Sequence, residues 1–311
     1  MYYNCSEFCL KLTRSGGVLP WIGPALRGLV AERFKDAVCQ QPVGERHTRW
    51  TKCTGCEFLP ECSYGRTFEP DPPADAKVFQ GQDDAARPLV LAPYFPVPEQ
   101  IRRGLEIPLR VVLCGGHANE DADMLLEMID HVGRRNGLGP EHVKFELVLA
   151  NGAAPQRREL NAADLPPHPD AVTGTLPRVG IGLIAPLFLR SRGENGKRRA
   201  NTRPQLSDLL RASLRTIGQL FRLYGEPLEA DFAALKAAAE NVRMVEHCYE
   251  PFKQRKWSSR SEQRFCIHGV VGGGVYENVP LALLPWLTWG GRLHVGNHRV
   301  AGAGGWRVVL D

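Results

Sequence analysis

Four of the nine cysteines fall within one short stretch, with a spacing typical of metal ligands rather than disulfides. Cys53 and Cys56 are two residues apart, which brings two thiolates onto one tight turn. Cys62 and Cys39 could complete a tetrahedral site, and His47 could replace Cys39. The pattern predicts a structural metal, with zinc as the simplest occupant. An iron–sulfur cluster also takes four thiolates, and unliganded cysteines are the remaining alternative.

Cationic side chains gather in two segments of the second half. Residues 190–222 hold nine Arg or Lys against two acids, and residues 253–264 hold five against one. The whole chain carries only +5, so the rest of it is net acidic. Such an uneven charge is typical of proteins that bind a phosphate backbone, although arginines on exposed helices would produce similar counts. The candidate contacts are Arg190, Arg192, Lys197, Arg198, Arg199, Arg203, Lys253, Arg255, Lys256, Arg260 and Arg264.

An aromatic residue and two glycine runs add to this set. Trp257 lies in the second basic segment, where it could stack on a base or belong to the core. Residues 272–274 and 302–305 are predicted to form glycine-rich loops on either side of an apolar helix. Glycine lets a backbone approach a phosphate or a neighbouring helix closely. The further candidate contacts are Gly272, Gly273, Gly274 and Arg299.

The elements that position these residues have the same order in both halves. The hydrophobic periodicity of the first half predicts, in sequence order, a strand at 5–12, a helix at 22–38, strands at 89–95 and 107–114, a helix at 121–135 and a strand at 143–149. A cysteine-rich insertion occupies about 39–73. The order β-α-β-β-α-β is the ferredoxin-like, or RRM-like, plan.

The second half predicts a looser version of the same order. Its elements are a strand at 179–189, helices at 204–224 and 229–247, a basic hairpin at 252–257 and 263–271, a helix at 279–289 and strands at 292–295 and 305–310. We therefore expect an α+β protein with tandem ferredoxin-like domains. The expected boundaries are 1–151 for the first domain, 152–177 for a linker and 178–311 for the second domain.

The C-terminal motif and several shorter ones resemble those of a known family. The segments Gly269–Val279, Gly291–His298 and Ala301–Val308 resemble the C-terminal signature of CRISPR-associated RAMP-superfamily endoribonucleases, which process precursor CRISPR RNA. Asn297 stands where a lysine is common. In the first half, Leu26-Arg27-Gly28 and the Cys53–Pro70 stretch resemble a subgroup with a cysteine-rich insertion. The resemblance covers nearly the whole chain.

This resemblance implies a reaction that needs no metal. A base removes the 2′-hydroxyl proton, the oxygen attacks the adjacent phosphate, and an acid protonates the leaving 5′-oxygen. The expected products are a 2′,3′-cyclic phosphate end and a guide RNA whose repeat hairpin stays bound. His47 is the first catalytic candidate, because the family's catalytic histidine commonly lies in or just after the first helix. Arg27, Arg33 and His268 are the others.

Two other functions fit the same residues. One is a non-cleaving subunit that holds guide RNA within a CRISPR effector complex, and the other is a ferredoxin-like metal or redox protein built on the cysteines. No apolar run approaches the ~18 residues of a membrane span, and no targeting segment is evident. We expect a cytoplasmic prokaryotic protein whose partners are CRISPR RNA and other effector subunits.

Overall fold

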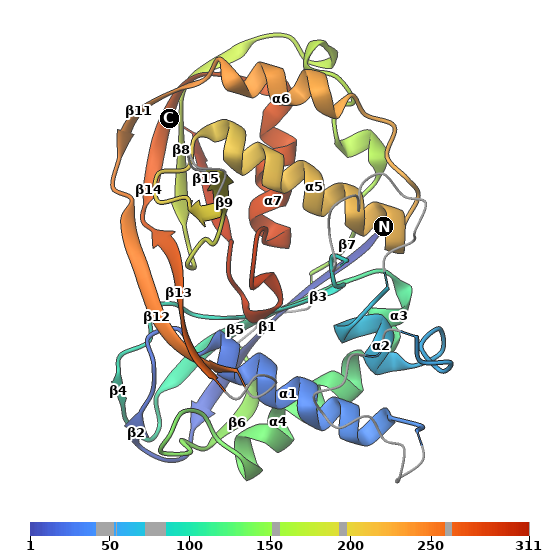
Figure 1. The fold of residues 1–311 in the computed structure, drawn as a ribbon, viewed down its shortest axis with the longest axis vertical. Helices are drawn as coiled ribbons and strands as arrows, with labels where there is room; N and C mark the ends of the chain where they lie inside the picture. Colours follow the sequence, from blue (N-terminus) through green and yellow to red (C-terminus); the bar gives the residue numbers. More distant parts are fainter. Residues whose placement is uncertain are drawn as a thin grey trace. The chain divides into compact units, whose positions relative to one another are not determined.

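The computed structural model describes residues 1–41, 53, 55–71, 85–150, 156–192, 198–258 and 263–310. The chain divides into two compact units. The first comprises residues 1–159, 223–225 and 258–263, and the second comprises 160–222, 226–257 and 264–311. Each unit is built around its own antiparallel sheet, and the two are described separately below (Figure 1).

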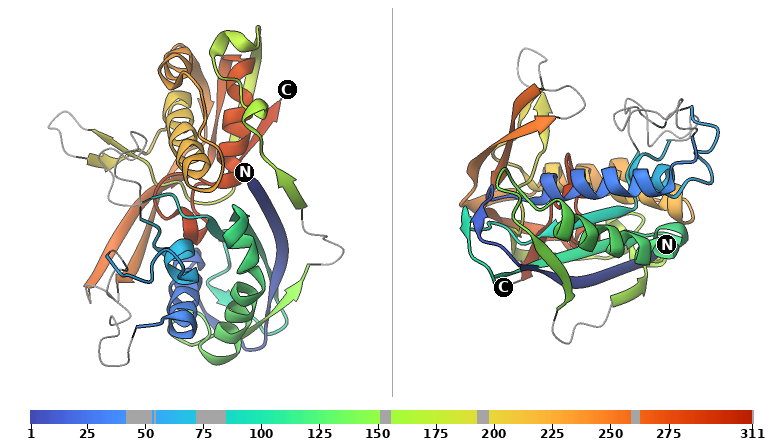
Figure 2. Two further views of the ribbon diagram at one scale, coloured as in Figure 1. Left: turned by 90° about the vertical axis from the view of Figure 1, so that its right-hand side faces the viewer. Right: turned by 90° about the horizontal axis from the view of Figure 1, so that it is seen from below.

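The first unit has the ferredoxin-like order. Its elements are β1 (Tyr2–Leu12), α1 (Gly23–Val38), β3 (Leu89–Pro93), β5 (Glu106–Cys114), α4 (Ala122–Arg135) and β6 (Phe145–Leu149). The strand order is β3-β5-β1-β6, and β1 pairs antiparallel with both β5 and β6. Because the crossovers through α1 and α4 are of the ferredoxin type, the two helices pack against each other on one face of the sheet (Figure 2).

Smaller elements complete this unit. A two-stranded sheet joins β2 (Gly16–Gly17) and β4 (Gln100–Ile101). Two short helices, α2 (Ser63–Phe68) and α3 (Gly116–Glu120), contact each other. The segment expected to be a linker contains β7 (Gln156–Glu159), which pairs with the first residues of β1. It also contains the short 3₁₀ helices η2 (Ala162–Asp164) and η3 (Pro169–Ala171).

Apolar residues at helical spacing hold α1 in place. Leu26, Val30 and Phe34 recur every four residues and are fully buried, and each side chain contributes about 1.5–3 kcal/mol on burial. Pro24 at the start of α1 lies where a missing N–H costs nothing. The expected helix at 22–38 is therefore confirmed.

The second unit repeats the plan with two insertions. Its core elements are β8 (Thr175–Leu183), α5 (Leu206–Tyr224), α6 (Phe232–Glu240), β11 (Arg243–His247), β14 (Gly273–Pro280), α7 (Leu284–Leu293) and β15 (Trp306–Leu310). The strand order β11-β14-β8-β15 is again ferredoxin-like. One insertion pairs β9 (Arg190–Arg192) with β10 (Arg198–Ala200), and the other pairs β12 (Glu250–Ser258) with β13 (Gln263–Val271). The short helices η4 (Leu281–Leu283) and η5 (Arg299–Ala301) lie on either side of α7.

The tandem ferredoxin-like fold is confirmed, and the structure corrects three local predictions. The helix expected to reach His247 ends at Glu240, and Arg243–His247 forms β11, because those residues gain a ladder of backbone hydrogen bonds with β14. The strand expected at 292–295 is the last turn of α7 followed by a turn at His294, whose φ is +57°. The helix expected at 279–289 begins only at Leu284, because Gly273–Pro280 forms β14 and pairs with β8. The pairing of β11 and β14 is tertiary, and local propensity does not contain it.

Candidate nucleic-acid interface and cysteine cluster

The β12–β13 hairpin presents cations to solvent. Lys253 and Arg255 are exposed, and Gln254 between them is buried. Side chains alternate between the two faces of a strand, so both cations lie on the same exposed face. His268, on β13, is exposed as well. A β-hairpin with a cationic face is suited to contact phosphates.

The β9–β10 hairpin adds a second group of cations. Arg190 and Arg199 are exposed, and the strands pair Arg198 with Arg192 and Ala200 with Arg190. Arg203 follows the hairpin and is also exposed. Lys197, Arg260 and His47 lie outside the described residues. The structure describes only the strand positions of Arg192, Arg198, Lys256, Trp257 and Arg264.

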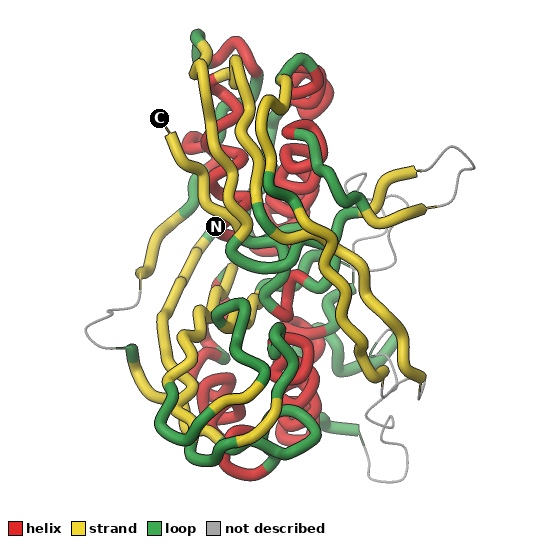
Figure 3. The backbone as a smooth tube through the Cα atoms, turned by 90° about the vertical axis from the view of Figure 1, so that its left-hand side faces the viewer, coloured by secondary structure: helices red, strands yellow, loops and turns green. Residues whose placement is uncertain are grey.

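Backbone hydrogen bonds join the bases of the two hairpins. Leu187 N–H donates to the Val270 carbonyl at 2.8 Å, and Val270 N–H donates back at 3.0 Å. Leu187 precedes β9, and Val270 lies in β13. Figure 3 shows the two strand pairs leaving this region in different directions. The two hairpins that carry the predicted contacts are therefore joined at their bases within the second unit.

The C-terminal glycine loop packs against the same place. The Phe188 ring lies 6.1 Å from Phe252 of β12 and 5.2 Å from His298 of the loop. Asn297 N–H donates to the Phe188 carbonyl at 3.1 Å. Sequence reasoning missed Phe188, although it lies in the apolar run just before the Arg-rich segment. Phe188 therefore contacts both the C-terminal loop and the base of the β12–β13 hairpin, and it lies just before β9.

The loop closes on itself through Gly304. Val295 N–H donates to the Gly304 carbonyl at 3.0 Å, and Gly304 N–H donates to the Pro186 carbonyl at 2.9 Å. Gly304 has a φ of +75°, and a Cβ there would lie 1.8 Å from the Val295 carbonyl oxygen. Only glycine, which has no Cβ, allows the backbone at position 304 to lie this close to the Val295 carbonyl. The predicted loop at 302–305 is present, and here its glycine lets two backbone segments meet.

Arg299 lies in the interior of the second unit. Its side chain is buried, and its Nε donates to the carbonyl oxygens of Leu293 at 2.8 Å and His294 at 3.1 Å. These are among the last carbonyls of α7 and the residue after it, which lack partners within the helix. This arrangement argues against the direct RNA contact that we expected from Arg299, because the guanidinium caps α7.

The first glycine run also differs from its expected role. Gly273 and Gly274 are buried within β14, opposite Gly182 and Ile181 of β8. A Cβ on Gly273 would lie 2.6 Å from the Ile181 carbonyl oxygen. Gly272 precedes the strand with a φ of +95°. These glycines therefore allow close strand pairing and a sharp turn rather than forming an open loop.

The described catalytic candidates do not form one group on α1. The Arg27 guanidinium lies 5.9 Å from the centre of the Phe68 ring. Arg33 makes an ion pair with Asp36 at 3.3 Å. Helical neighbours are three or four residues apart, so these two arginines, six apart, do not face each other. His268 lies on β13 in the other unit.

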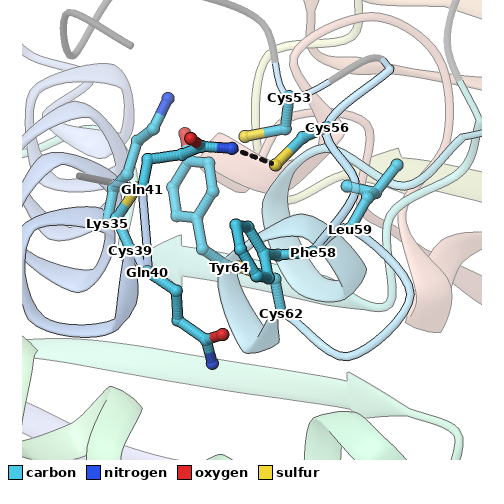
Figure 4. A pocket seen from close by; sticks show the side chains of 10 residues that line it. All are labelled: Lys35, Cys39, Gln40, Gln41, Cys53, Cys56, Phe58, Leu59, Cys62 and Tyr64. Atoms are coloured by element: carbon cyan, nitrogen blue, oxygen red, sulfur yellow. Dashed lines mark hydrogen bonds between the residues drawn. The ribbon is translucent and has the colours of Figure 1, made fainter. Parts of the chain in front are cut away.

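All four predicted cysteine ligands line one cavity (Figure 4). Its walls also include Lys35, Gln41 and Tyr64. Gln41 Nε2 donates to the Cys56 sulfur at 3.3 Å, and the Glu69 carboxylate accepts from Cys53 N–H at 2.8 Å. Burial raises the pKa of the Cys53 thiol to about 12, although nearby Lys35 acts in the opposite direction.

Lys35 is a cavity residue that sequence reasoning missed. Its side chain is buried, and Nζ lies 5.2 Å from the centre of the Tyr64 ring. Lys35 precedes Cys39 by four residues, which places both on one face of α1. That spacing was the signal available in the sequence. Among the residues that the structure describes, no three His, Cys, Asp or Glu side chains are grouped so that they could hold a metal ion.

Comparison with known families identifies the chain. The model of the AF_1859_N family, described as an N-terminal domain, matches residues 1–165, which is more than half of the sequence. The chain belongs to the AF_1859_N family. The match to AF_1859_N covers α1, the cysteine cluster and the whole sheet of the first unit. No curated protein matches the chain.

Solved structures resemble this AF_1859_N protein along its whole length. A structure described as a Cas6 product complex has a TM-score of 0.56 at 13% identity and covers 99% of both chains. Cas6 of Thermus thermophilus has a TM-score of 0.52 at 13% identity, covering 99% of this chain and 98% of its own. A partial Cas6-RT-Cas1–Cas2 complex has a TM-score of 0.55 at 12% identity, covering all of this chain and 46% of the longer one.

These likenesses show that the AF_1859_N protein has the fold of Cas6. The resemblance to RAMP-type CRISPR-associated proteins is thus confirmed for the fold, and the cysteine-rich subgroup stays a prediction. None of the described helices has the length and apolar character that crossing a membrane would require.

Proposed function

We propose that this protein binds CRISPR repeat RNA and cleaves it as an endoribonuclease. The observation that carries the proposal is the likeness to a Cas6 product complex, which covers 99% of both chains. The joined cationic hairpins of the second unit support it, because an RNA-processing enzyme must grip a phosphate backbone.

The proposed chemistry uses the RNA's own 2′-hydroxyl. His47 removes its proton, the oxygen attacks the adjacent phosphorus, and the 5′-oxygen leaves with a proton from an acid, so that a 2′,3′-cyclic phosphate forms. A cation such as Arg27 stabilises the charge that develops on the phosphate oxygens. Arg33 and His268 stay as further candidates. No metal takes part in these steps.

Product retention and assembly belong to the same proposal. Exposed Arg190, Arg199, Lys253 and Arg255 hold the stem of the repeat hairpin by its phosphates, since duplex RNA is recognised mostly by shape and backbone. Two solved structures similar to this chain are described as assemblies of Cas6, RT, Cas1 and Cas2. We therefore propose other Cas proteins as partners.

The decisive test is cleavage of end-labelled repeat RNA in EDTA. It compares the wild-type chain with His47→Ala, Arg27→Ala and the control Arg307→Ala, whose exposed side chain lies on β15. We expect one cut in the repeat, a cyclic phosphate end, and a 10²–10⁴-fold slower reaction for the variant that removes the base. The control should cut at the wild-type rate.

Other results would change the assignment. Tight binding of repeat RNA without cutting by the wild type would favour the guide-holding subunit and remove all catalytic assignments. Equal cutting by all variants would keep the nuclease and exclude His47 and Arg27. Failure to prefer repeat RNA over a scrambled hairpin would contradict the proposal itself.

A further inference from the structure

The cysteine cavity is not used by the proposed function. Its four sulfur-bearing side chains come from separate short segments of the first unit, yet they line one space. Figure 4 shows Cys53 and Cys56 next to each other on one side, with the Gln41 amide reaching toward Cys56. An RNA-binding surface would not require four thiols to gather at one point. The question is which ligand they suit.

Backbone geometry determines where each cysteine lies. Cys39 caps the C-terminal end of α1, and its N–H donates to the Lys35 carbonyl at 2.9 Å. Cys62 immediately precedes α2. Cys56 N–H donates to the Cys53 carbonyl at 2.9 Å across a turn that contains Gly55, whose φ is +78°. Two helix ends and one tight turn therefore place four cysteines around the same cavity.

The cavity has room for a single ion. Its free volume is about 20 Å³, which is room for roughly one water molecule. One metal ion with four thiolate ligands fits such a space once the walls close around it. An iron–sulfur cluster also takes four thiolates, and analysis for iron and acid-labile sulfide distinguishes it from zinc.

Charge and hydrogen bonding at the walls favour a negatively charged thiolate centre. Four thiolates around a divalent cation carry a net charge of −2. The Gln41 amide already donates to the Cys56 sulfur at 3.3 Å. Buried Lys35 lines the same cavity and supplies a positive charge. Donors and cations near a metal centre stabilise its thiolates.

We propose that Cys39, Cys53, Cys56 and Cys62 bind one structural Zn²⁺. Each thiol releases its proton to solvent as its Zn–S bond forms, so the step needs no oxidant or reductant. The described side chains are not yet grouped at coordination distance, and binding therefore requires the cysteine side chains to rotate inward. The ion joins the end of α1 to the start of α2 and holds the insertion in place.

The test measures metal in the full-length chain, purified without chelator and dialysed against trace zinc. We expect about one zinc per chain by elemental analysis, released by a thiol-modifying mercurial and detected with a colorimetric zinc indicator. Co²⁺ in place of zinc should produce the intense visible bands of a tetrahedral thiolate site. Cys56→Ser should lower zinc content severalfold. Cys266→Ser, whose exposed thiol lies on β13, is the matched control and should keep it.

Several results would overturn the proposal. These are zinc far below one per chain together with featureless cobalt spectra, or equal zinc in Cys56→Ser and Cys266→Ser. A brown protein that contains iron and acid-labile sulfide would replace zinc with a cluster. If Cys56→Ser does not fold, the cobalt spectrum of the wild type decides alone. RNA cleavage does not enter these measurements, so the proposed function stands or fails separately.

Discussion

At the residue scale, the C-terminal motif depends on groups that face inward. Buried Arg299 caps α7, and His294 Nδ1–H donates a hydrogen bond to the Ala303 carbonyl at 3.0 Å. Gly304 allows the loop to close on Val295. The motif is thus a packed structural unit that holds the loop against the bases of the hairpins. Residues of this kind contribute to the proposed RNA interface only by holding the exposed hairpins in place.

Replacing Gly304 tests this role. Gly304→Ala forces a side chain into a left-handed backbone position and against the Val295 carbonyl, so we expect a loss of about 1–3 kcal/mol in the free energy of unfolding. The matched control is Gly28→Ala, in α1, where nothing lies within 4 Å of the added Cβ. That change should stabilise the protein by about 0.5–1 kcal/mol. Urea unfolding measures both, and equal stability of the two variants would contradict the closed loop.

At the scale of elements, a buried pair of tyrosines joins β14 to the start of β12. The Tyr249 and Tyr276 hydroxyls lie 2.8 Å apart, and Tyr276 donates to the Pro204 carbonyl at 3.0 Å. Burial raises the pKa of Tyr249 to about 12, and it raises the pKa of Tyr276 as well. The neutral forms are therefore favoured by folding. This pair anchors the cationic hairpin to the sheet of the second unit.

The raised pKa values predict alkaline sensitivity. An unfolded tyrosine ionises near pH 10, so the stabilisation from Tyr249 is complete below pH 10 and is lost as pH rises through about 12. We expect the urea midpoint to fall steeply between pH 10 and 12. The double variant Tyr249→Phe, Tyr276→Phe should have a lower midpoint at pH 8 and a shallower fall above pH 10. An unchanged fall in that variant would exclude this pair as the cause.

At the scale of the whole molecule, charge is distributed unequally along the chain. The formal net charge is +5, yet the exposed cations of the two hairpins are concentrated in the second unit. Cations that neutralise phosphates release counterions, so affinity falls with salt in proportion to the number of contacts. The salt dependence of the proposed RNA binding would therefore count the phosphate contacts that the intact protein makes.

The described part of the hairpin region offers five exposed cations, Arg190, Arg199, Arg203, Lys253 and Arg255. Each phosphate contact contributes about 0.7 on single strands and about 0.9 on duplex DNA, so log K against log salt should have a slope of about −3.5 to −4.5. The double variant Lys253→Ala, Arg255→Ala should reduce the magnitude of that slope by about 1.4–1.8. Arg307→Ala should leave it unchanged. Fluorescence anisotropy at several salt concentrations measures all three, and an unaltered slope in the double variant would exclude β12 from the interface.

The sequence by itself determined the order of the core elements in the first unit, but in the second unit it missed the core strands β11 and β14. Strands such as β1 and helices such as α1 and α4 have apolar residues at periods of two and 3.6, and those periods are local. The basic hairpin and the grouping of cysteines are also visible in local composition. These features could be predicted because each depends on residues close together in the chain.

Only the tertiary structure decided which residues face inward and which distant segments meet. Gly273 and Gly274 became strand residues because β14 pairs on both sides, and Arg299 became a cap because α7 ends beside it. The bond between Leu187 and Val270 joined two hairpins that are far apart in sequence. Such outcomes depend on long-range packing and hydrogen bonding, whose energies no short window of sequence contains.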